Sequence, residues 1–225
     1  MPAALPAMQS ERRTAFAALK AELSAQSRLR ESIKPTLASA IPDLDRLLCG
    51  GFPEGAIATL EGATGRWSVA AALAATTSRC GLVAILDDGS LYPPSLVKAG
   101  VRLERVIVVP AKKALHVARA VDILLRARIC RLVLMPAVSL RDAVWTRLAT
   151  LAQRSGAVVL VMAARAGAAL SAVAEMRVHC AFERALMYGT HGVWGCFAGF
   201  ELAVDLRKHR FAPAGDRAHL NAVVR

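Results

Sequence analysis

Residues 41–73, IPDLDRLLCGGFPEGAIATLEGATGRWSVAAAL, contain the pattern that decides the fold. A leucine-rich segment predicts a short helix that stops at Gly50-Gly51. The apolar run Ala56–Leu60 predicts a buried strand, and the glycine-rich turn 62–65 leads from it into an alanine-rich helix over Val69–Thr77. A strand that passes through a glycine-rich turn directly into a helix is the first half of a βαβ unit.

The same alternation continues for about 90 residues beyond this stretch. Strands that alternate with helices at this spacing predict an α/β fold with a mostly parallel sheet, covered by helices on both faces. The strands are continuous apolar runs, as burial on both faces requires. The predicted strands are Leu82–Leu86, Val106–Val109, Leu132–Met135 and Ala157–Met162, and the predicted helices are Pro94–Ala99, Ala114–Arg128 and Arg141–Arg154.

Towards the C-terminus the pattern changes, and apolar residues recur at every second position. The segments Val178–Leu186 and Val193–Leu206 alternate, with a turn at Gly189–Gly192, and so predict two antiparallel strands at the C-terminal side of the sheet. One face of the second strand is apolar and consists of Trp194, Cys196, Ala198, Phe200, Leu202, Val204 and Leu206. The segment Ala163–Glu175, which precedes these strands, is predicted to be an ordinary connection.

The N-terminal part predicts a helix over Ser10–Lys34, because Ser10 can cap it and Pro35 ends it. Phe16, Leu19 and Leu23 form a narrow apolar stripe on this helix. Two interpretations stay open: the stripe binds a partner, or it packs on the protein's own domain. We therefore divide the chain into an N-terminal helix and linker (1–38), an α/β core (39–210) and a C-terminal segment (211–225).

Composition narrows the class of protein. The chain has 225 residues and a formal charge of +12, and it is long enough to bury a hydrophobic core. Its longest charge-free run, Ala185–Phe200, contains four glycines and a histidine, so we expect no membrane span. The start of the chain lacks the order of a secretion signal, which predicts a cytoplasmic protein. The five scattered cysteines predict buried reduced thiols, with no metal and no cofactor.

The run Leu44-Asp45-Arg46-x-Leu48-x-Gly50-Gly51-x-Pro53-x-Gly55, followed by a strand, a glycine-rich turn and a helix, resembles the start of the RecA ATPase core. The next strand and Asp87-Asp88-Gly89 continue the resemblance, which covers about residues 39–210. The arginine-rich helices and the ending Leu206-Arg207-Lys208-His209-Arg210 are most similar to the ImuA family, the RecA-like accessory proteins of bacterial damage-induced mutagenesis.

This resemblance implies a scaffold or regulator of error-prone translesion DNA synthesis, associated with the nucleoid. The implied partners are an ImuB-like homologue of Y-family polymerases and an error-prone replicative-type polymerase, with RecA and DNA as further candidates. Two alternatives stay open: a SulA-like inhibitor that binds the tubulin-like division protein, and an atypical DNA-dependent ATPase.

The sequence departs from the RecA pattern where nucleotide is bound. A phosphate-binding loop has the form G-x-x-x-x-G-K-[ST], whose lysine reaches the phosphates and whose hydroxyl holds Mg²⁺. Here the loop closes about two residues early, and we expect it to be vestigial. It consists of Gly62, Thr64, Gly65, Arg66, Trp67 and Ser68, with Arg66 in place of the lysine and Trp67 in place of the hydroxyl.

Two carboxylates are also missing by comparison with RecA-like ATPases. Gly89 stands where the water-activating glutamate would be, and Met135-Pro136 ends a strand where a metal-site aspartate would be. Phosphoryl transfer depends on positioning and on charge stabilisation by Mg²⁺ and cations. We therefore expect no enzymatic activity, and nucleotide binding without hydrolysis remains an alternative.

Residues 98–154 contain 12 of the Lys and Arg residues and only three acidic residues. This basic character favours an anionic partner such as nucleic acid, bound through phosphates without sequence preference. The other interpretation is a solvated set of helix faces. The candidate DNA-binding residues are Arg126, Arg128, Arg131, Arg207, Lys208 and Arg210.

Overall fold

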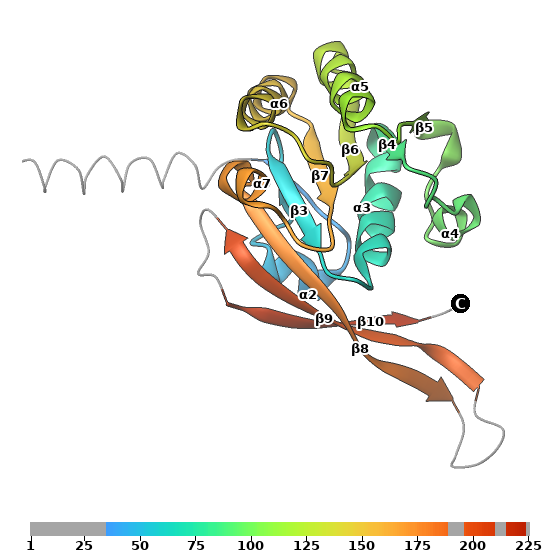
Figure 1. Ribbon diagram of the computed structural model, residues 1–225. Helices are drawn as coiled ribbons and strands as arrows, with labels where there is room; N and C mark the ends of the chain where they lie inside the picture. The colour runs from blue at the N-terminus through green and yellow to red at the C-terminus, as the bar shows by residue number, and fades with distance from the viewer. Residues whose placement is uncertain (1–34, 189–195, 210–214, 224–225) are drawn as a thin grey trace, which may run out of the picture. The chain divides into compact units, whose positions relative to one another are not determined.

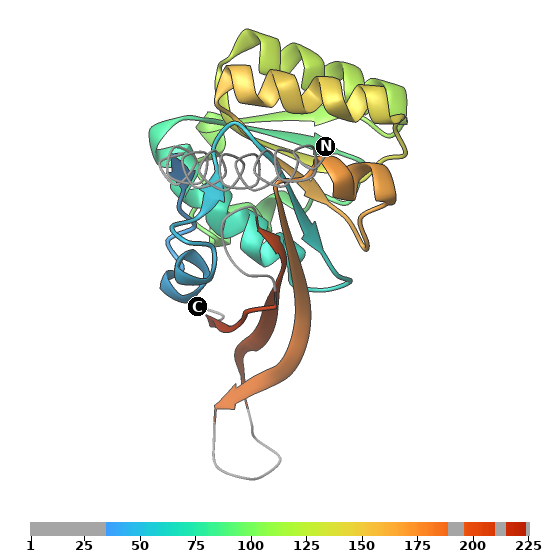
Figure 2. The same cartoon turned by 90° about the vertical axis from the view of Figure 1, so that its left-hand side faces the viewer.

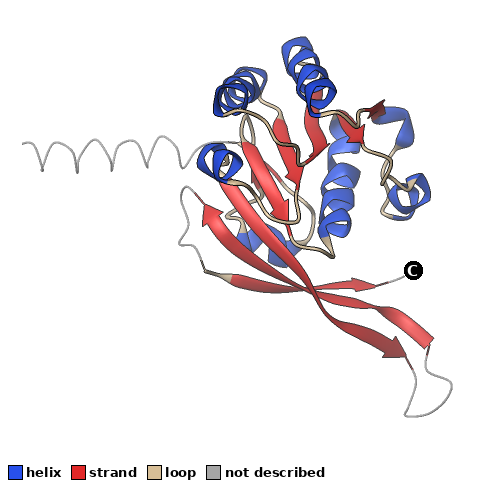
Figure 3. Ribbon diagram, viewed as in Figure 1, coloured by secondary structure: helices blue, strands red, loops and turns tan. Residues whose placement is uncertain are grey.

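The computed structural model describes residues 35–188, 196–209 and 215–223. Within them, eight strands form one sheet in the order β10-β9-β8-β3-β7-β6-β4-β5 (Figures 1 and 3). Strands β3 to β8 run parallel, whereas β8, β9 and β10 are mutually antiparallel. Their bounds are β3 Ile57–Glu61, β4 Leu82–Asp87, β5 Val106–Pro110, β6 Cys130–Pro136, β7 Val158–Met162, β8 Met176–Tyr188, β9 Cys196–His209 and β10 Arg217–Val223.

Helices cover both faces of the parallel strands (Figure 1). Helices α2 (Pro42–Leu47), α3 (Arg66–Cys80) and α4 (Pro93–Lys98) pack on one face. Helices α5 (Ala114–Ala127), α6 (Asp142–Ser155) and α7 (Ala168–Val173) pack on the other, where α5 and α6 lie side by side (Figure 2). A two-stranded sheet of β1 (Thr36–Leu37) and β2 (Phe52–Pro53) and a short 3₁₀ helix, Leu103–Arg105, complete the described elements.

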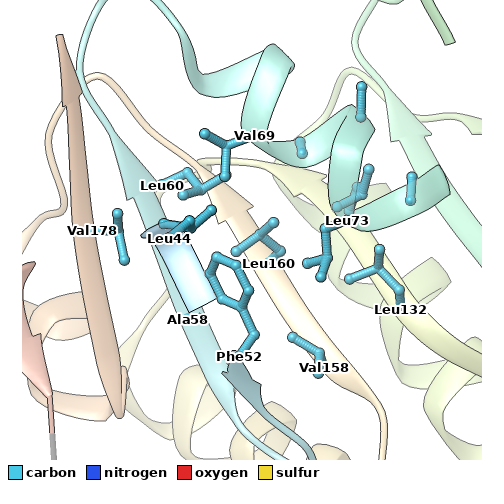
Figure 4. Packing of buried hydrophobic residues seen from close by; sticks show 14 of the residues in the cluster. Leu44, Phe52, Ala58, Leu60, Val69, Leu73, Leu132, Val158, Leu160 and Val178 are labelled. Atoms are coloured by element: carbon cyan, nitrogen blue, oxygen red, sulfur yellow. The ribbon is translucent and has the colours of Figure 1, made fainter. Parts of the chain in front are cut away.

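Successive side chains of each buried strand point to opposite faces of the sheet, and this alternation explains why the hydrophobic core has two layers. Val83 and Ile85 of β4 belong to the core beneath α3, while Ala84 and Leu86 face α5. On the α3 side the core brings together leucines of the strands, Phe52 and the small residues of the helix (Figure 4). The alanines of α3 let the helix approach the sheet closely. Small apolar residues therefore fill much of this core layer, and this explains why the sequence is rich in apolar residues and poor in aromatic ones.

The predicted α/β fold is therefore confirmed, with a mostly parallel sheet and antiparallel strands at its C-terminal side. The apolar face predicted for β9 is also found, since Leu202, Val204 and Leu206 are buried in the core. The predicted helix over 10–34 and Trp194 lie outside the described residues. None of the described helices is long and apolar enough to span a membrane.

Three features differ from the sequence analysis. The segment that we separated from the core at residue 211 contains β10, which pairs with β9 along its length and buries Leu220. The connection 163–175 contains helix α7. The expectation of buried thiols is wrong for Cys49 and Cys80, which are exposed, and holds for Cys130 and Cys180.

The cysteines offer a direct test of this arrangement. Burial raises the pKa of the Cys180 thiol to about 12, so almost no thiolate forms there at pH 8. We expect a thiol-alkylating reagent to modify Cys49 rapidly in the native protein and Cys180 only after unfolding, as measured by mass spectrometry of the digested chain. Rapid labelling of Cys180 under native conditions would contradict the packing of β8.

Candidate functional site

The turn between β3 and α3, residues 62–65, is held tightly against the antiparallel strands. Gly62 has a φ of +113°, and a Cβ built on it would lie 1.9 Å from the carbonyl oxygen of Cys180 in β8. Gly65 has a φ of +79°, and its Cβ would lie 2.7 Å from a methyl carbon of Leu202 in β9. The positive φ favours glycine at both positions, and at Gly62 any side chain would also collide with the backbone of β8.

Hydrogen bonds fasten the same turn on two sides. The Gly62 amide donates to the carbonyl of Ala164, which follows β7, at 3.0 Å. The amide of Phe182 in β8 donates to the hydroxyl oxygen of Thr64 at 2.9 Å. The turn is therefore fixed between the end of β7 and β8, and it lacks the extra residues with which a phosphate-binding loop wraps a triphosphate.

A buried ion pair lies directly before the turn. Arg177 of β8 donates from Nε to Oε1 of Glu61 at 2.7 Å and from Nη2 to Oε2 at 3.0 Å. The Thr59 hydroxyl donates to the same carboxylate at 3.0 Å. Burial acts to raise the pKa of Glu61, but the hydrogen bonds from Arg177, Thr59 and the Ala166 backbone outweigh it and hold the pKa below its usual value.

A cavity of about 200 Å³ opens at the carboxyl edge of the parallel strands. Arg66 and Trp67, at the start of α3, line one side of it, and residues that follow β4, β6 and β7 line the others. This edge is where ligands bind in open α/β sheets. The lining residues are Arg66, Trp67, Leu86, Asp88, Ser90, Leu134, Met135, Pro136, Ala137, Met162 and Ala164.

The cavity contains a single carboxylate among its lining residues, that of Asp88, which accepts a hydrogen bond from the Ser90 amide. The neighbouring Asp87 is engaged elsewhere, since its Oδ1 accepts the amides of Gly89 at 2.8 Å and Leu91 at 3.0 Å. Thus the predicted loop residues Arg66 and Trp67 reach the cavity, whereas Thr64 is turned towards β8. Ser68 lies in the first turn of α3 and is half-buried.

The described DNA-binding candidates all lie towards the edge where the parallel strands begin, which is opposite to the cavity. Arg126 and Arg128 end α5, Arg131 lies in β6, and Arg207 and Lys208 lie at the end of the antiparallel β9. Arg210 and the partner-binding candidates Phe16, Leu19 and Leu23 lie outside the described residues.

Most of these candidates already have partners within the protein. Arg126 Nε lies 2.7 Å from Asp122 Oδ2, and Arg131 forms an ion pair with Glu54. Lys208 Nζ donates to the Ser171 carbonyl at 2.9 Å, at the end of α7, and Arg207 contacts Asp205. Arg128 is exposed in a left-handed conformation and has no acidic partner among the described residues.

Sheet order reveals further arginines that sequence position alone did not group. Arg154, Arg128, Arg79 and Arg105 come just before β7, β6, β4 and β5, and these four strands are neighbours in that order. All four are exposed, and the described residues give none of them an acidic partner. These four arginines therefore lie along the same edge of the sheet, Arg79 at the end of α3 on one face and Arg128 and Arg154 at the ends of α5 and α6 on the other, and we call this set the arginine row.

The comparisons with known proteins concern the family and the fold. The family described as MT3502 N-terminal domain matches residues 46–167. Among solved structures, the chain is similar to the crystal structure of the RadB recombinase, with a TM-score of 0.65 and 19% sequence identity, over 83% of this chain and 96% of that chain. No curated protein matches the sequence significantly. At this identity, the structural similarity shows that the fold is RecA-like.

The close approach at Gly62 can be tested by substitution. Gly62→Ala places a methyl group against the Cys180 carbonyl in a backbone conformation that alanine disfavours. We expect a loss of at least about 3 kcal/mol in the free energy of unfolding, measured by urea denaturation. The matched control is Gly100→Ala, which has a φ of +85° and nothing within 4 Å, and should lose only about 1–2 kcal/mol. Equal losses would show that the turn does not press on β8.

Proposed function

Because the chain belongs to the MT3502 N-terminal domain family and has a RecA-like fold, we propose that it is a non-catalytic accessory protein of damage-induced, error-prone DNA synthesis. In this role it acts as a scaffold or regulator for mutagenic polymerase components. An ImuB-like homologue and an error-prone replicative-type polymerase are the proposed partners, and DNA is a further one.

The observation that carries the proposal is the composition of the cavity at the carboxyl edge. Efficient phosphoryl transfer needs a phosphate-wrapping loop, a Mg²⁺ ion held by protein oxygens and a group that positions the attacking water. The cavity offers Arg66 at the start of α3, but the Thr64 hydroxyl is bonded to β8 and β6 ends at Pro136. Asp88 alone is a poor substitute for the two carboxylates of a hydrolytic site.

A fold that keeps its sheet while this edge lacks catalytic groups is suited to binding rather than turnover. The chain keeps both hydrophobic layers of the core and the tightly packed turn, so the fold is complete without the catalytic groups. Retention of the fold without the chemistry supports a role in which the surfaces of the protein, instead of a nucleotide cycle, act on its partners.

The arginine row supports a phosphate-dominated contact with nucleic acid. Arginine binds phosphate oxygens with two parallel hydrogen bonds, and four such side chains stand at successive strands. The described residues of this edge include no aromatic platform close to the row, and this favours contact with the backbone over stacking of bases.

The first test separates an accessory role from an ATPase cycle. We expect no ATP turnover above background, with or without DNA, and no change on Arg66→Ala. In cells that lack the native protein, the Arg66→Ala variant should restore damage-induced mutagenesis to the wild-type level. A Mg²⁺-dependent rate that Arg66→Ala abolishes would favour the ATPase alternative. Arrest of cell division without an effect on mutagenesis would favour the division-inhibitor alternative.

The second test concerns DNA. We expect the logarithm of the binding constant to fall linearly with the logarithm of salt concentration, with little preference for sequence. The combined variant Arg79→Glu, Arg128→Glu and Arg154→Glu should weaken binding at least tenfold more than a control of equal charge, Arg46→Glu, Lys98→Glu and Arg165→Glu. Fluorescence anisotropy with labelled DNA measures the salt dependence of binding and the affinities of the two variants. Equal weakening by the two variants would mean that total charge, and not the arginine row, determines binding.

A further inference from the structure

The three antiparallel strands at the C-terminal side bring together three side chains with metal-binding chemistry. Glu183 comes from β8, Glu201 from β9 and His219 from β10, and one ligand atom of each lies within 4.8 Å of the other two. We propose that these residues bind a divalent transition-metal ion, with Zn²⁺ as the best fit. None of the three residues lines the cavity, and the proposal does not depend on the proposed function.

The position of each ligand has a local structural cause. The register of β8 against β9 shifts between Phe182 and Arg184, and Glu183 is the extra residue of this bulge. A bulge re-aims a side chain that regular alternation would place elsewhere. His219 lies opposite Ala203, two residues along β9 from Glu201, so the two share one face of the sheet.

The distances favour a third ligand over a simple hydrogen-bonded pair. His219 Nδ1 lies 2.6 Å from Glu183 Oε2, and a hydrogen bond explains that contact. Glu201 Oε1 lies 3.8 Å from the same nitrogen, beyond hydrogen-bond distance but close enough for the two atoms to share one bound ion. With bonds of about 2.1 Å, tetrahedral ligand atoms lie about 3.4 Å apart, so small side-chain rotations bring all three atoms to that spacing.

A neighbouring cation orients the central ligand. Arg184 Nε is bonded to Glu201 Oε2, and this leaves Oε1 directed towards His219. Glu201 is also the most buried of the three, with 13% of its side chain exposed. Outer contacts of this kind fix metal ligands in position, because they remove side-chain freedom before the ion arrives.

Charge and donor chemistry select the kind of ion. The two carboxylates carry two negative charges, of which Arg184 offsets one at Glu201, and among the described residues Glu183 has only His219 as a hydrogen-bond partner. Nearby Arg217 is engaged by Asp205. One imidazole nitrogen with two carboxylate oxygens suits Zn²⁺ or a similar first-row ion and disfavours Mg²⁺ and Ca²⁺, which take oxygen ligands. Such an ion would link β10, the outermost strand, to β8 and β9.

The test is titration of the metal-free full-length chain with Zn²⁺, followed by calorimetry. We expect one saturable site of micromolar or tighter affinity, weakened at least tenfold by Glu183→Gln and by His219→Ala. The control variants Glu104→Gln and His116→Ala change exposed residues of the same types and should bind as the wild type does. Zinc should also slow amide hydrogen exchange in residues 217–223 of the wild type but not of Glu183→Gln.

Cobalt substitution separates this site from the cysteines. Co²⁺ bound by one imidazole and two carboxylates gives visible d–d bands without the thiolate charge-transfer band that cysteine ligation produces. A thiolate band, unchanged affinity in both Glu183→Gln and His219→Ala, or the absence of saturable binding would each overturn the proposal.

Discussion

The ion pair between Glu61 and Arg177 joins the two halves of this sheet. It lies where the parallel strand β3 meets β8, whose other edge is antiparallel, and it is bidentate and mostly buried. Removal of one partner from a buried pair costs about 3–5 kcal/mol, because the remaining charge has no compensation. Since the pKa of Glu61 is lowered in the folded protein, this stabilisation is present at neutral pH and is lost as the pH falls below the ordinary range of the carboxyl group.

The turn after Glu61 depends on this junction. Once β3 and β8 are held in register, the Gly62 backbone touches the Cys180 carbonyl and Thr64 accepts the Phe182 amide. The same contacts hold the turn, which is about two residues shorter than a phosphate-binding loop, between the end of β7 and β8. The conformation of the turn is thus coupled to the packing of the C-terminal strands, and Arg66 and Trp67, which follow the turn, line the cavity.

Other features of function follow from strand order more than from single residues. The arginine row exists because Arg154, Arg128, Arg79 and Arg105 precede strands that are neighbours in space but not in sequence. Likewise, Glu183, Glu201 and His219 meet only because β8, β9 and β10 are adjacent. In both cases the charged residues are distant in sequence, and the adjacent strands of the sheet bring them close together.

Local patterns in the sequence determined the parallel layers, since buried strands and alanine-rich helices have distinct periods and the glycine-rich turn marks the passage from β3 to α3. They also located Arg66 and Trp67 at the ligand edge. They did not predict β10: Arg217–Val223 does alternate apolar and polar residues, but the run is short and most of its apolar residues are small. They also did not reveal that Arg126 and Arg131 are occupied by Asp122 and Glu54, or that Glu61 pairs with Arg177 across 116 residues. Pairings between distant residues depend on sheet order and register, and only the tertiary structure decides these.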